Sequence, residues 1–547
     1  MSNNNATYNN INVSVVSDVK KWDIEPLSRD NFFVNRIMNH YGYTGDVITD
    51  ILDSRETYEG SPEQFPSEMY VIKLYDMAQS FLTIDTEIFD ILKSTMFWYV
   101  YNNFNHEIPV FTDIDEKGVE HLRMNLVVDY LIKKWVIIYW NDIRFIWSGE
   151  RFVEDKHQIE KDAVEILKEI GYSDKRKAEP IVRDIIYKIS KESAYIRNKH
   201  PFNKLDNRYV SCRNGVVVRK KKGCIVPNSP AFGFSHRIGV DYDPNINTDE
   251  VMKFIEDIVA EKDVKHLIRI LSHILMRDAK YQLSYLLVGE GSNGKSVFIK
   301  LLTKTVGIKN LSRVSLQDLV DNKFATADLL GKLLNVYSDL EKDELKNTGK
   351  FKLLSSGDGV SAEKKFKDRF DFENIAVFVF SANDVPTVND NTWSFWRRWS
   401  IINFPIRFEV DPEFEARMIT NKNASALLKL AVDEMEDIDK NGIHRNEEVA
   451  IIREMWQRRS SSLYSFVTDK VEQCVGGEVS RAEFMREYSI YCAQNMATPE
   501  SKDIYSRLSR MISGVSEGYI GSTRMIKGIR FKTQHKPISN QGTITCS

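Results

Sequence analysis

A glycine-rich loop between an apolar strand and an apolar helix constrains the fold of this chain more than any other feature. Residues 289–296 read GEGSNGKS, which fits the pattern GxxxxGKS, and the apolar runs 285–288 and 297–302 flank the loop. Glycines let such a loop wrap so that its backbone N–H groups point at phosphate oxygens, and the following helix adds favourable partial charge at its N-terminus. The pattern predicts a phosphate-binding loop, because a purely structural glycine turn would not require Lys followed by Ser.

The loop and the first residues of its helix supply the candidate nucleotide contacts. Lys295 is expected to reach the β- and γ-phosphates of ATP, and the hydroxyl of Ser296 is expected to ligate Mg²⁺. The candidate ATP-binding residues are Gly289, Glu290, Gly291, Ser292, Asn293, Gly294, Lys295, Ser296 and Val297.

Two later apolar runs end in polar side chains. Residues 331–341 read GKLLNVYSDLE; Asp339 can hold Mg²⁺ through water, and Glu341 could polarise the attacking water. Acids also follow buried strands as plain solvated loop residues, so that alternative stays open. Residues 375–383, IAVFVFSAN, are almost wholly apolar, like a strand buried on both faces. Asn383 at their end is placed to orient a water or to touch the γ-phosphate.

A pair of arginines between large aromatic residues follows, in the sequence FWRRW (395–399). The arginines could be structural, stacked on tryptophan and paired with acids. One of them could instead reach the γ-phosphate held by a neighbouring subunit, as an arginine finger does, with Arg398 the first candidate and Arg397 the second. The catalytic candidates are therefore Lys295, Asp339, Glu341, Asn383, Arg397 and Arg398.

These motifs together resemble the superfamily 3 helicases, in particular the primase–helicases of phages, plasmids and poxviruses. The resemblance rests on GEGSNGKS, SDLE, SGDGVSAEKKFK, VFVFSAND and FWRRW, with weaker matches at 209–216 and 242–244. It implies an AAA+ ATPase that uses ATP and Mg²⁺, assembles as a homo-hexameric ring and moves 3′ to 5′ along one DNA strand.

The resemblance also assigns roles to single residues. Glu341 lies where many relatives carry a second acid but is offset by one leucine, which leaves its role as a catalytic base open. Lys295 and Ser296 match the Walker A positions, Asp339 the Walker B acid, Asn383 sensor 1, and Arg397 or Arg398 the trans-acting finger.

The segment 357–367, GDGVSAEKKFK, resembles the hairpin that carries a lysine and an aromatic or histidine residue into the ring channel of this family. Lysines there would meet the phosphates of single-stranded DNA, and Phe366 could stack on a base. Glu363 and Asp368 temper the local charge, so a charged, solvated loop is the alternative. The candidate DNA-binding residues are Lys364, Lys365, Phe366 and Lys367.

The alternation of strand and helix after Tyr281 predicts an α/β fold. We expect an AAA+ P-loop ATPase core with a parallel sheet, flanked by a mainly helical N-terminal region and a C-terminal winged-helix-like domain. At roughly 150 residues per domain, 547 residues allow three or four domains. The expected parts are an accessory domain (1–120), a collar or linker domain (121–247), the ATPase/helicase domain (248–410), a helical linker (411–455) and the winged-helix-like, DNA-binding domain (456–547).

Shorter patterns predict further elements. Residues 117–134 look like an amphipathic helix, and residues 136–152 alternate like two strands joined near 141–142, which indicates a hairpin. Short strands are expected within 208–241. In the last segment the expected order is three helices, followed by short strands between 519 and 531.

Composition narrows the class of protein. Hydrophobic residues make up 42% and charged residues 28%, which excludes wholesale disorder, collagen and a disulfide scaffold. The formal net charge is −3, so contact with nucleic acid has to come from a local patch, such as segment 456–547 with 13 Lys and Arg against 8 Asp and Glu. Five cysteines without a CxxC pair, and no uncharged apolar run near the ~18–20 residues that cross a bilayer, predict a soluble, cytoplasmic protein without a membrane partner.

The expected function is that of an ATP-dependent replicative DNA helicase of a virus or plasmid, acting on single-stranded and forked DNA beside a primase, an origin-binding protein or a polymerase. An ATP-switched origin or single-strand binder without processive unwinding is one alternative, and a P-loop kinase is another. A third is a primase–helicase with a degenerate primase region. Asp113 and Asp115 form a DxD, but His121 and His157 would complete a metal site by position only, and a turn before a helix is the plainer interpretation.

Overall fold

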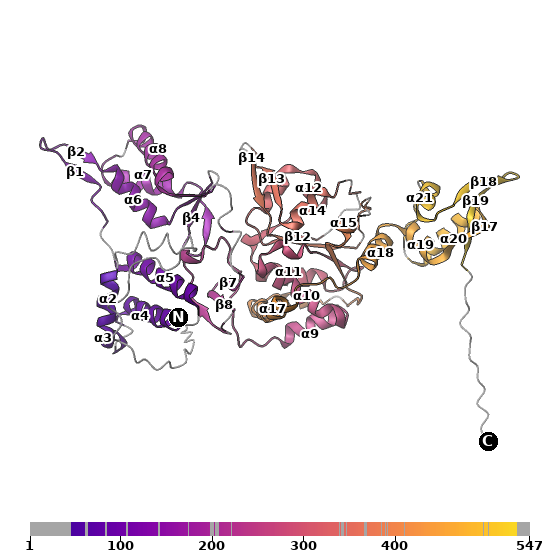
Figure 1. Cartoon of the computed structure of the whole chain (residues 1–547), viewed down its shortest axis with the longest axis horizontal. Coiled ribbons are helices and arrows are strands. Elements are labelled where there is room, and N and C mark those ends of the chain that lie inside the picture. Colours follow the sequence, from indigo (N-terminus) through magenta and orange to yellow (C-terminus); the bar gives the residue numbers. More distant parts are fainter. Residues whose placement is uncertain are drawn as a thin grey trace, which may run out of the picture. The chain divides into compact units, whose positions relative to one another are not determined.

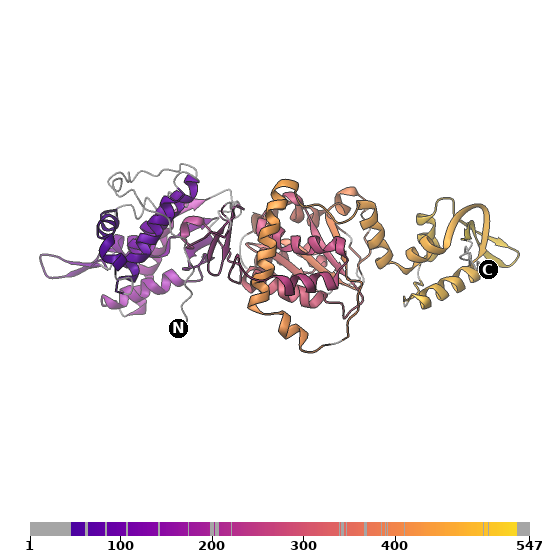
Figure 2. The ribbon, with the colours of Figure 1, turned by 90° about the horizontal axis from the view of Figure 1, so that it is seen from below.

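The computed structural model describes residues 45–532 with short gaps (Figures 1 and 2). Contacts divide the chain into two compact units, Met1–Ile238 and Gly239–Ser547, each of which is described by itself. The division lies a few residues before the predicted boundary at 247, and the finer domain limits stay predictions. The gaps are residues 61–63, 82–84, 105–107, 141–142, 173, 197–201, 203–206, 220, 222, 339, 341–343, 346, 366–368, 384, 389, 391, 410, 496 and 502.

Helices form the first described part of the N-terminal unit. Two of them, α4 and α5, pack against each other through buried aliphatic residues, among them Leu74 on α4 and Leu92 and Met96 on α5. Each such side chain contributes roughly 1.5–3 kcal/mol when fully buried. The helices are α2 (Gly45–Asp53), α3 (Arg55–Gly60), α4 (Pro66–Gln79) and α5 (Thr86–Phe104).

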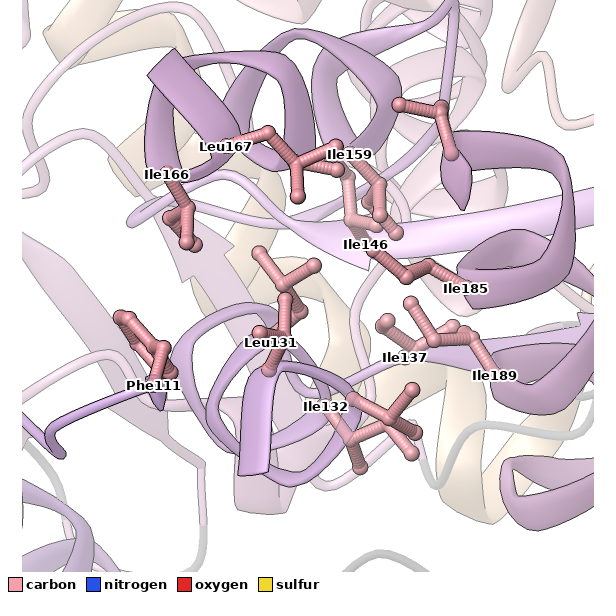
Figure 3. Close-up of a cluster of buried hydrophobic side chains, with 14 of the residues drawn as sticks. Phe111, Leu131, Ile132, Ile137, Ile146, Ile159, Ile166, Leu167, Ile185 and Ile189 are labelled. Atoms are coloured by element: carbon pink, nitrogen blue, oxygen red, sulfur yellow. The ribbon is translucent and has the colours of Figure 1, made fainter. Parts of the chain in front are cut away.

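A four-stranded sheet of order β5-β4-β3-β6 and three helices follow in the same unit. Leu131, Ile159 and Ile185, one from each helix, are buried together with Ile137 and Ile146 from the strand region (Figure 3). This cluster joins the helices to the sheet. The elements are α6 (Met124–Trp135), β3 (Ile138–Trp140), β4 (Ile143–Trp147), β5 (Phe152–Glu154), α7 (Gln158–Glu169), α8 (Lys175–Glu192) and β6 (Ala194–Ile196).

Two local predictions in this region have different outcomes. Strands β3 and β4 pair antiparallel, as predicted for 136–152, although the expected turn at 141–142 lies outside the described residues. The helix predicted over 117–134 is wrong in its first part. Strands β1 (Thr112–Ile114) and β2 (Glu120–Leu122) form a hairpin there instead. The turn between them is stabilised because Asp115 accepts two backbone hydrogen bonds and Gly118 adopts a φ of 77°.

A small antiparallel sheet of order β7-β8-β9 ends the unit and confirms the short strands predicted there. Gly215 opens β8 with a φ of 141°, and a Cβ at this position would lie 2.6 Å from the carbonyl oxygen of Val226. The close approach of β8 and β9 therefore requires glycine. The elements are β7 (Tyr209–Cys212), β8 (Gly215–Val218), β9 (Ile225–Val226) and the short helix η3 (Pro230–Phe232).

The C-terminal unit contains a five-stranded sheet of order β11-β12-β15-β10-β16, and all its strand pairs are parallel. Every residue of β10 and β15 is buried, as expected for a parallel sheet that helices cover on both faces (Figures 1 and 2). The chain is thus a mixed α/β protein, as predicted. The strands are β10 (Ser284–Val288), β11 (Leu311–Ser312), β12 (Leu334–Tyr337), β15 (Val377–Ala382) and β16 (Trp399–Asn403).

Helices and one hairpin complete this part of the unit. The hairpin pairs β13 (Gly359–Glu363) with β14 (Arg369–Glu373), directly before β15. The helices are α9 (Asp249–Ile258), α10 (Glu261–Met276), η4 (Ala279–Tyr281), α11 (Lys295–Val306), η5 (Ile308–Asn310), α12 (Leu316–Asp321), α13 (Lys323–Thr326), η6 (Ala327–Leu329), α14 (Gly349–Ser356), α15 (Trp393–Trp396), α16 (Phe414–Met418), α17 (Asn421–Asn441) and α18 (Val449–Ser460).

The last described segment has its own buried cluster, which includes Phe466, Phe484, Tyr488, Leu508 and Ile529. Its antiparallel sheet has the order β17-β19-β18. The first strand of this sheet, β17, follows the first helix of the segment and was not predicted from the sequence. Within the described residues, no helix combines the length and apolar composition needed to cross a bilayer. The elements are α19 (Ser462–Lys470), β17 (Val471–Ser480), α20 (Arg481–Gln494), α21 (Ile504–Met511), β18 (Ser516–Ile520) and β19 (Thr523–Phe531).

Candidate nucleotide-binding site

The loop after β10 turns back on itself before α11 begins. Gly291 and Gly294 have φ values of 97° and 84°, and Ser292 between them has a φ of 46°, which few non-glycine residues adopt. At Gly294 a Cβ would lie 2.5 Å from Cγ2 of Ile258, the last residue of α9. Glycine is therefore required at this position by packing as well as by backbone conformation.

The first half of the loop is held against the chain that follows β16. A Cβ at Gly289 would lie 2.0 Å from Nδ2 of Asn293 and 2.7 Å from the carbonyl oxygen of Phe404. Asn293 is buried, and its Nδ2 donates to the same Phe404 carbonyl at 3.4 Å. The Asn293 side chain thus fills the space that a larger residue at Gly289 would occupy.

Lys295 connects the loop to the end of β15. It is the first residue of α11, and only 6% of it is exposed. Its Nζ donates to the carbonyl oxygen of Gly289, to Oδ1 of Asn293 at 3.2 Å and to Oδ1 of Asn383 at 3.5 Å. Two predicted site residues, 88 positions apart, therefore meet at the carboxyl edge of the sheet, where parallel α/β sheets bind their ligands.

The surroundings of Lys295 disfavour its charged form. Burial, together with the nearby positive charge of Arg459, lowers the pKa of the Lys295 amine from 10.5 to about 8. A bound triphosphate would bring opposite charge to the same amine and raise its pKa again. The positive charge of Lys295 is therefore destabilised when the site is empty and would be stabilised by a bound anion.

This shift predicts a pH dependence of ATP binding. Affinity should be constant while Lys295 is protonated in the nucleotide-free protein and should fall as the pH rises above about 8. Above this pH, Lys295 is deprotonated in the nucleotide-free protein but stays protonated in the complex with ATP. Binding of ATP then requires the uptake of one proton. Calorimetry in buffers of different ionisation enthalpy should find almost no proton uptake one pH unit below that value and clear uptake one unit above it.

The matched control for this experiment is Lys295→Arg, because a guanidinium does not lose its proton in this range. Nucleotide binding by this variant should proceed without proton uptake at both pH values. Equal proton uptake by wild type and Lys295→Arg would assign the titration to another group.

The predicted acids lie outside the described residues, but their neighbours place the segment. Ser338, just before Asp339, is exposed, and the backbone N–H of Leu340 donates to the carbonyl oxygen of Ser381 at 3.2 Å. This bond holds the end of the acid-bearing segment beside the end of β15. Leu340, which separates the two predicted acids in the sequence, therefore lies at the same sheet edge as the loop.

The remaining loop candidates differ in exposure. Ser296 and Glu290 are exposed and Val297 is half-buried. An exposed hydroxyl at the second residue of α11 suits a Mg²⁺ ion, which proteins usually hold with one or two carboxylates, substrate phosphates and water. Among the described residues, no group of three or more His, Cys, Asp or Glu side chains is placed to hold a metal.

One residue at this edge has no counterpart among the sequence predictions. Arg459, near the end of α18, donates from Nη1 to the carbonyl oxygen of Asn383 at 3.4 Å and from Nη2 to Oδ1 of Asn403 at 3.2 Å. No local motif marks it, because it is the second of two arginines in a charged helix.

Arg397 and Arg398 lie at the opposite edge of the sheet. The backbone N–H of Ser284, the first residue of β10, donates to the carbonyl oxygen of Arg398 at 2.7 Å, whereas the phosphate loop follows the other end of β10. A strand of this length spans about 13 Å at ~3.3 Å per residue. The two arginines are thus separated from the loop of their own subunit by the length of a strand.

The two arginines differ in what surrounds their guanidinium groups. Arg398 is only 6% exposed and donates to the hydroxyls of Ser355, at 3.0 Å, and Ser356, at 2.6 Å, and to the carbonyl oxygen of Ser394. These three bonds hold the guanidinium within the domain, where they tie the end of α14 to α15.

Arg397 is half-buried and lies next to an exposed aromatic residue. Its guanidinium carbon is 5.2 Å from the ring centroid of Trp393, which is 63% exposed, and Nη2 donates to Oε1 of Gln282. Arg397 and Trp393 together form a cationic and aromatic surface at this edge of the sheet.

The hairpin β13–β14 carries two of the four DNA-binding candidates within the described residues. Lys365 is exposed, and Nζ of Lys364 lies 6.0 Å from the ring centroid of Phe370. Glu363 pairs with Lys323 of α13 at 2.6 Å, so this acid is engaged by a cation outside the hairpin. Phe366 and Lys367 lie outside the described residues.

The DxD of the N-terminal unit supports a turn. Asp115 accepts two backbone N–H groups of the following turn at 2.9 Å and contacts Nε2 of His121 at 3.0 Å. The bond to His121, with the backbone bonds, lowers the pKa of Asp115. Asp113 lies opposite His121 in the strand register of the hairpin, and His157 occupies the N-cap position of α7 without a side-chain cap hydrogen bond. This arrangement fits the plainer, structural interpretation of the DxD.

Two family models match parts of the chain. One, described as D5 N terminal like, matches residues 125–260, and the other, a family of unknown function (DUF5906), matches residues 287–398. The second match runs from the end of β10 to Arg398 and so contains the phosphate loop, β15 and the hairpin.

The curated relatives are viral. A protein of African swine fever virus described as a primase, C962R, is 23% identical over 336 residues, or 55% of this chain and 35% of that protein. A protein of Acanthamoeba polyphaga mimivirus described as a helicase, L207/L206, is 23% identical over 335 residues, or 59% of this chain and 33% of that protein. The chain thus spans about a third of the length of the curated relatives it matches.

Solved structures give a weaker likeness. The apo structure of the NrS-1 C-terminal region matches 74% of this chain and 98% of that chain at 13% identity, with a TM-score of 0.40, which is too low to bear on fold or function. The sequence matches, by contrast, support a relationship to viral proteins of the primase and helicase kind.

Proposed function

We propose that this chain is an ATP-dependent DNA helicase with an AAA+ core, which acts in the replication of a virus or plasmid. The observation that carries the proposal is the meeting of Lys295 and Asn383 at the carboxyl edge of the sheet. Strand β15 lies between β10, which leads into the loop, and β12, which leads toward Asp339. In this proposal, one nucleotide at this edge would touch a lysine, an amide and an acid that follow three neighbouring strands.

The roles within the site follow from these positions. Lys295 would neutralise charge on the β- and γ-phosphates, and Asn383 would orient the attacking water. Mg²⁺, held by Ser296 and Asp339, would supply further positive charge at the phosphates. Glu341 would act as the base that polarises the water.

Assembly into a homo-hexamer would complete the site from the neighbouring subunit. Both arginines of FWRRW lie too far from their own loop to act in cis. Arg398 is buried and engaged by three serines, whereas Arg397 lies beside the exposed Trp393. These surroundings favour Arg397 as the finger that reaches the neighbour's γ-phosphate, which reverses the order that the sequence suggested.

The order of elements at the C-terminus supports a winged-helix-like domain, with a helix, a strand, two helices and a final hairpin. Its DNA contacts would come from the helices and not from the strands. Cations of β19 are paired with acids of β17 and β18: Arg524 with Glu517, Lys527 with Glu478, and Arg530 with Glu472.

Single-stranded DNA is expected to stimulate ATP turnover, and the protein is expected to separate a forked duplex. The double variant Lys364→Ala/Lys365→Ala should lose most of both activities, because lysines on the hairpin would track the DNA backbone. Its ATP turnover without DNA should persist, since the hairpin is not at the nucleotide edge. Strand displacement and phosphate release, measured with and without DNA, test the expectation.

The matched control removes two exposed lysines from α17, Lys422 and Lys440, and should leave both activities intact. Log affinity for single-stranded DNA should also fall with log salt, and less steeply in the hairpin variant than in this control. Stimulation without any unwinding would favour the ATP-switched binding protein, and hydrolysis indifferent to DNA would favour a phosphotransferase.

A further inference from the structure

One face of α8 combines cations with an exposed aromatic residue. Arg183, Tyr187 and Lys191 follow one another at intervals of four residues, so they share one face of the helix. All three are exposed, Tyr187 by 63%, and Nζ of Lys191 lies 5.3 Å from the centroid of the Tyr187 ring. Arg176, seven residues before Arg183, is also exposed and extends this face by two turns. We call these four residues the α8 stripe.

The opposite face of α8 belongs to the core of the N-terminal unit. Ile185 and Ile189 are buried in the cluster that joins the three helices to the sheet (Figure 3). A helix that lies in a membrane surface needs an apolar face of its own, and α8 uses its apolar face within the protein. The stripe is therefore an outward, polar surface on a helix that packing holds in place.

The charge of the stripe is not cancelled by acids. Among the described residues, no ion pair engages Arg176, Arg183 or Lys191, whereas Arg144 of the same unit is held by two acids. Glu179, one turn before Arg183, is the acid on this face, and it is not paired with Arg183. As a whole, α8 carries six Lys and Arg against three Asp and Glu, and its neighbour α7 carries two against four.

We propose that the α8 stripe binds single-stranded DNA, with its cations on phosphates and the ring of Tyr187 stacked on a base. Proteins bind single strands with a row of cations that follows the backbone and with aromatic side chains on which bases stack. From Arg176 to Lys191 the helix rises about 22 Å at ~1.5 Å per residue, enough for several nucleotides. A duplex would offer phosphates to the stripe, but its base faces are stacked on one another.

This inference rests on the proposed function, because it takes DNA as the ligand. It adds a DNA contact in the N-terminal unit that needs neither the nucleotide loop nor the β13–β14 hairpin. Binding at the stripe is therefore measured with the full chain, without nucleotide, in the background of the hairpin variant Lys364→Ala/Lys365→Ala.

Tyr187→Ala is expected to weaken binding of a short single-stranded oligonucleotide about five-fold or more in this background, since one stacked base is lost. The slope of log affinity against log salt should not change, because no charge is removed. Tyr187→Phe keeps the ring and should bind like the hairpin variant. Affinity for a duplex of the same length should be the same with and without the Tyr187 ring.

Arg183→Ala/Lys191→Ala is expected to change the salt dependence instead. Loss of two phosphate contacts should make the slope shallower by about 1.4, at ~0.7 for each phosphate of a single strand. Glu179→Gln should act in the opposite direction and raise affinity, because it removes the acid of the same face. The matched control is Lys161→Ala/Lys168→Ala, which removes two exposed lysines of the acidic α7 and should alter neither affinity nor slope.

Stacking and charge thus have separate signatures, which loosening of α8 would not reproduce. Affinity and slope unchanged in both stripe variants, or changed equally in the α7 control, would overturn the inference, as would a hairpin variant with no remaining affinity for single-stranded DNA. If the wild-type chain binds no single-stranded DNA, the proposed function fails as well. If the hairpin variant binds more weakly than wild type and the stripe variants lose nothing further, the proposed function stands and only the stripe is wrong.

Discussion

Lys295→Ala is expected to lower ATP turnover on the order of 10²–10³-fold, the loss typical when a preorganised group that stabilises developing charge is removed from a protected site. The amine is the buried cation of the loop and converges with Asn293 and Asn383 on one point. Alanine removes its charge and leaves those amide oxygens without their donor. Phosphate release at saturating ATP measures the effect.

The control lies on the same helix. Lys300→Ala removes an exposed lysine of α11 that pairs with Glu415 at 2.6 Å, and an exposed pair of this kind contributes roughly 0–1 kcal/mol. This variant should hydrolyse ATP like wild type. Near-normal hydrolysis by Lys295→Ala would rule out the phosphate-loop assignment, and a comparable loss in both variants would point to damage of α11.

The sequence predicts those site residues that belong to a recognisable local sequence pattern. The loop is marked by its own glycines and by the Lys–Ser pair, and Asn383 by the apolar strand it ends. Their meeting follows because the carboxyl ends of neighbouring parallel strands share one edge. Arg459 could not be found this way, because it reaches the edge from a helix whose own sequence is ordinary, and only the tertiary fold brings it there.

The same distinction applies to the fold. Strand β17 was missed because it contains Gly476 and Gly477 and a register shift between Gln473 and Glu478, so no regular alternation marks it. Its pairing with β19 depends on residues more than 40 positions away, which no local pattern records. Likewise, the excess of basic residues in this segment can be counted from the sequence. The sequence does not reveal that acids on neighbouring strands neutralise the basic residues of β19.

Arg397→Ala is expected to bind ATP normally and to hydrolyse it roughly 10³-fold or more slowly, as when an arginine finger is lost. The residue lies a strand length from its own loop, so an effect on hydrolysis has to pass to a neighbouring subunit. Arg398→Ala should behave differently. It removes a buried group bonded to Ser355, Ser356 and Ser394, and should lower the melting temperature and ATP binding together.

A mixing experiment decides whether Arg397 acts in trans. Arg397→Ala subunits keep an intact loop, and Lys295→Ala subunits keep an intact finger. In a ring with excess Lys295→Ala, most loops of the Arg397→Ala subunits face a neighbour that carries Arg397, so those interfaces are complete and activity should return. Arg398→Ala mixed in the same way should gain nothing, because its defect stays within the subunit. Rescue of Arg398→Ala but not of Arg397→Ala would restore Arg398 as the finger, and rescue of neither would leave both arginines as packing residues, because a defect confined to one subunit cannot be complemented across an interface.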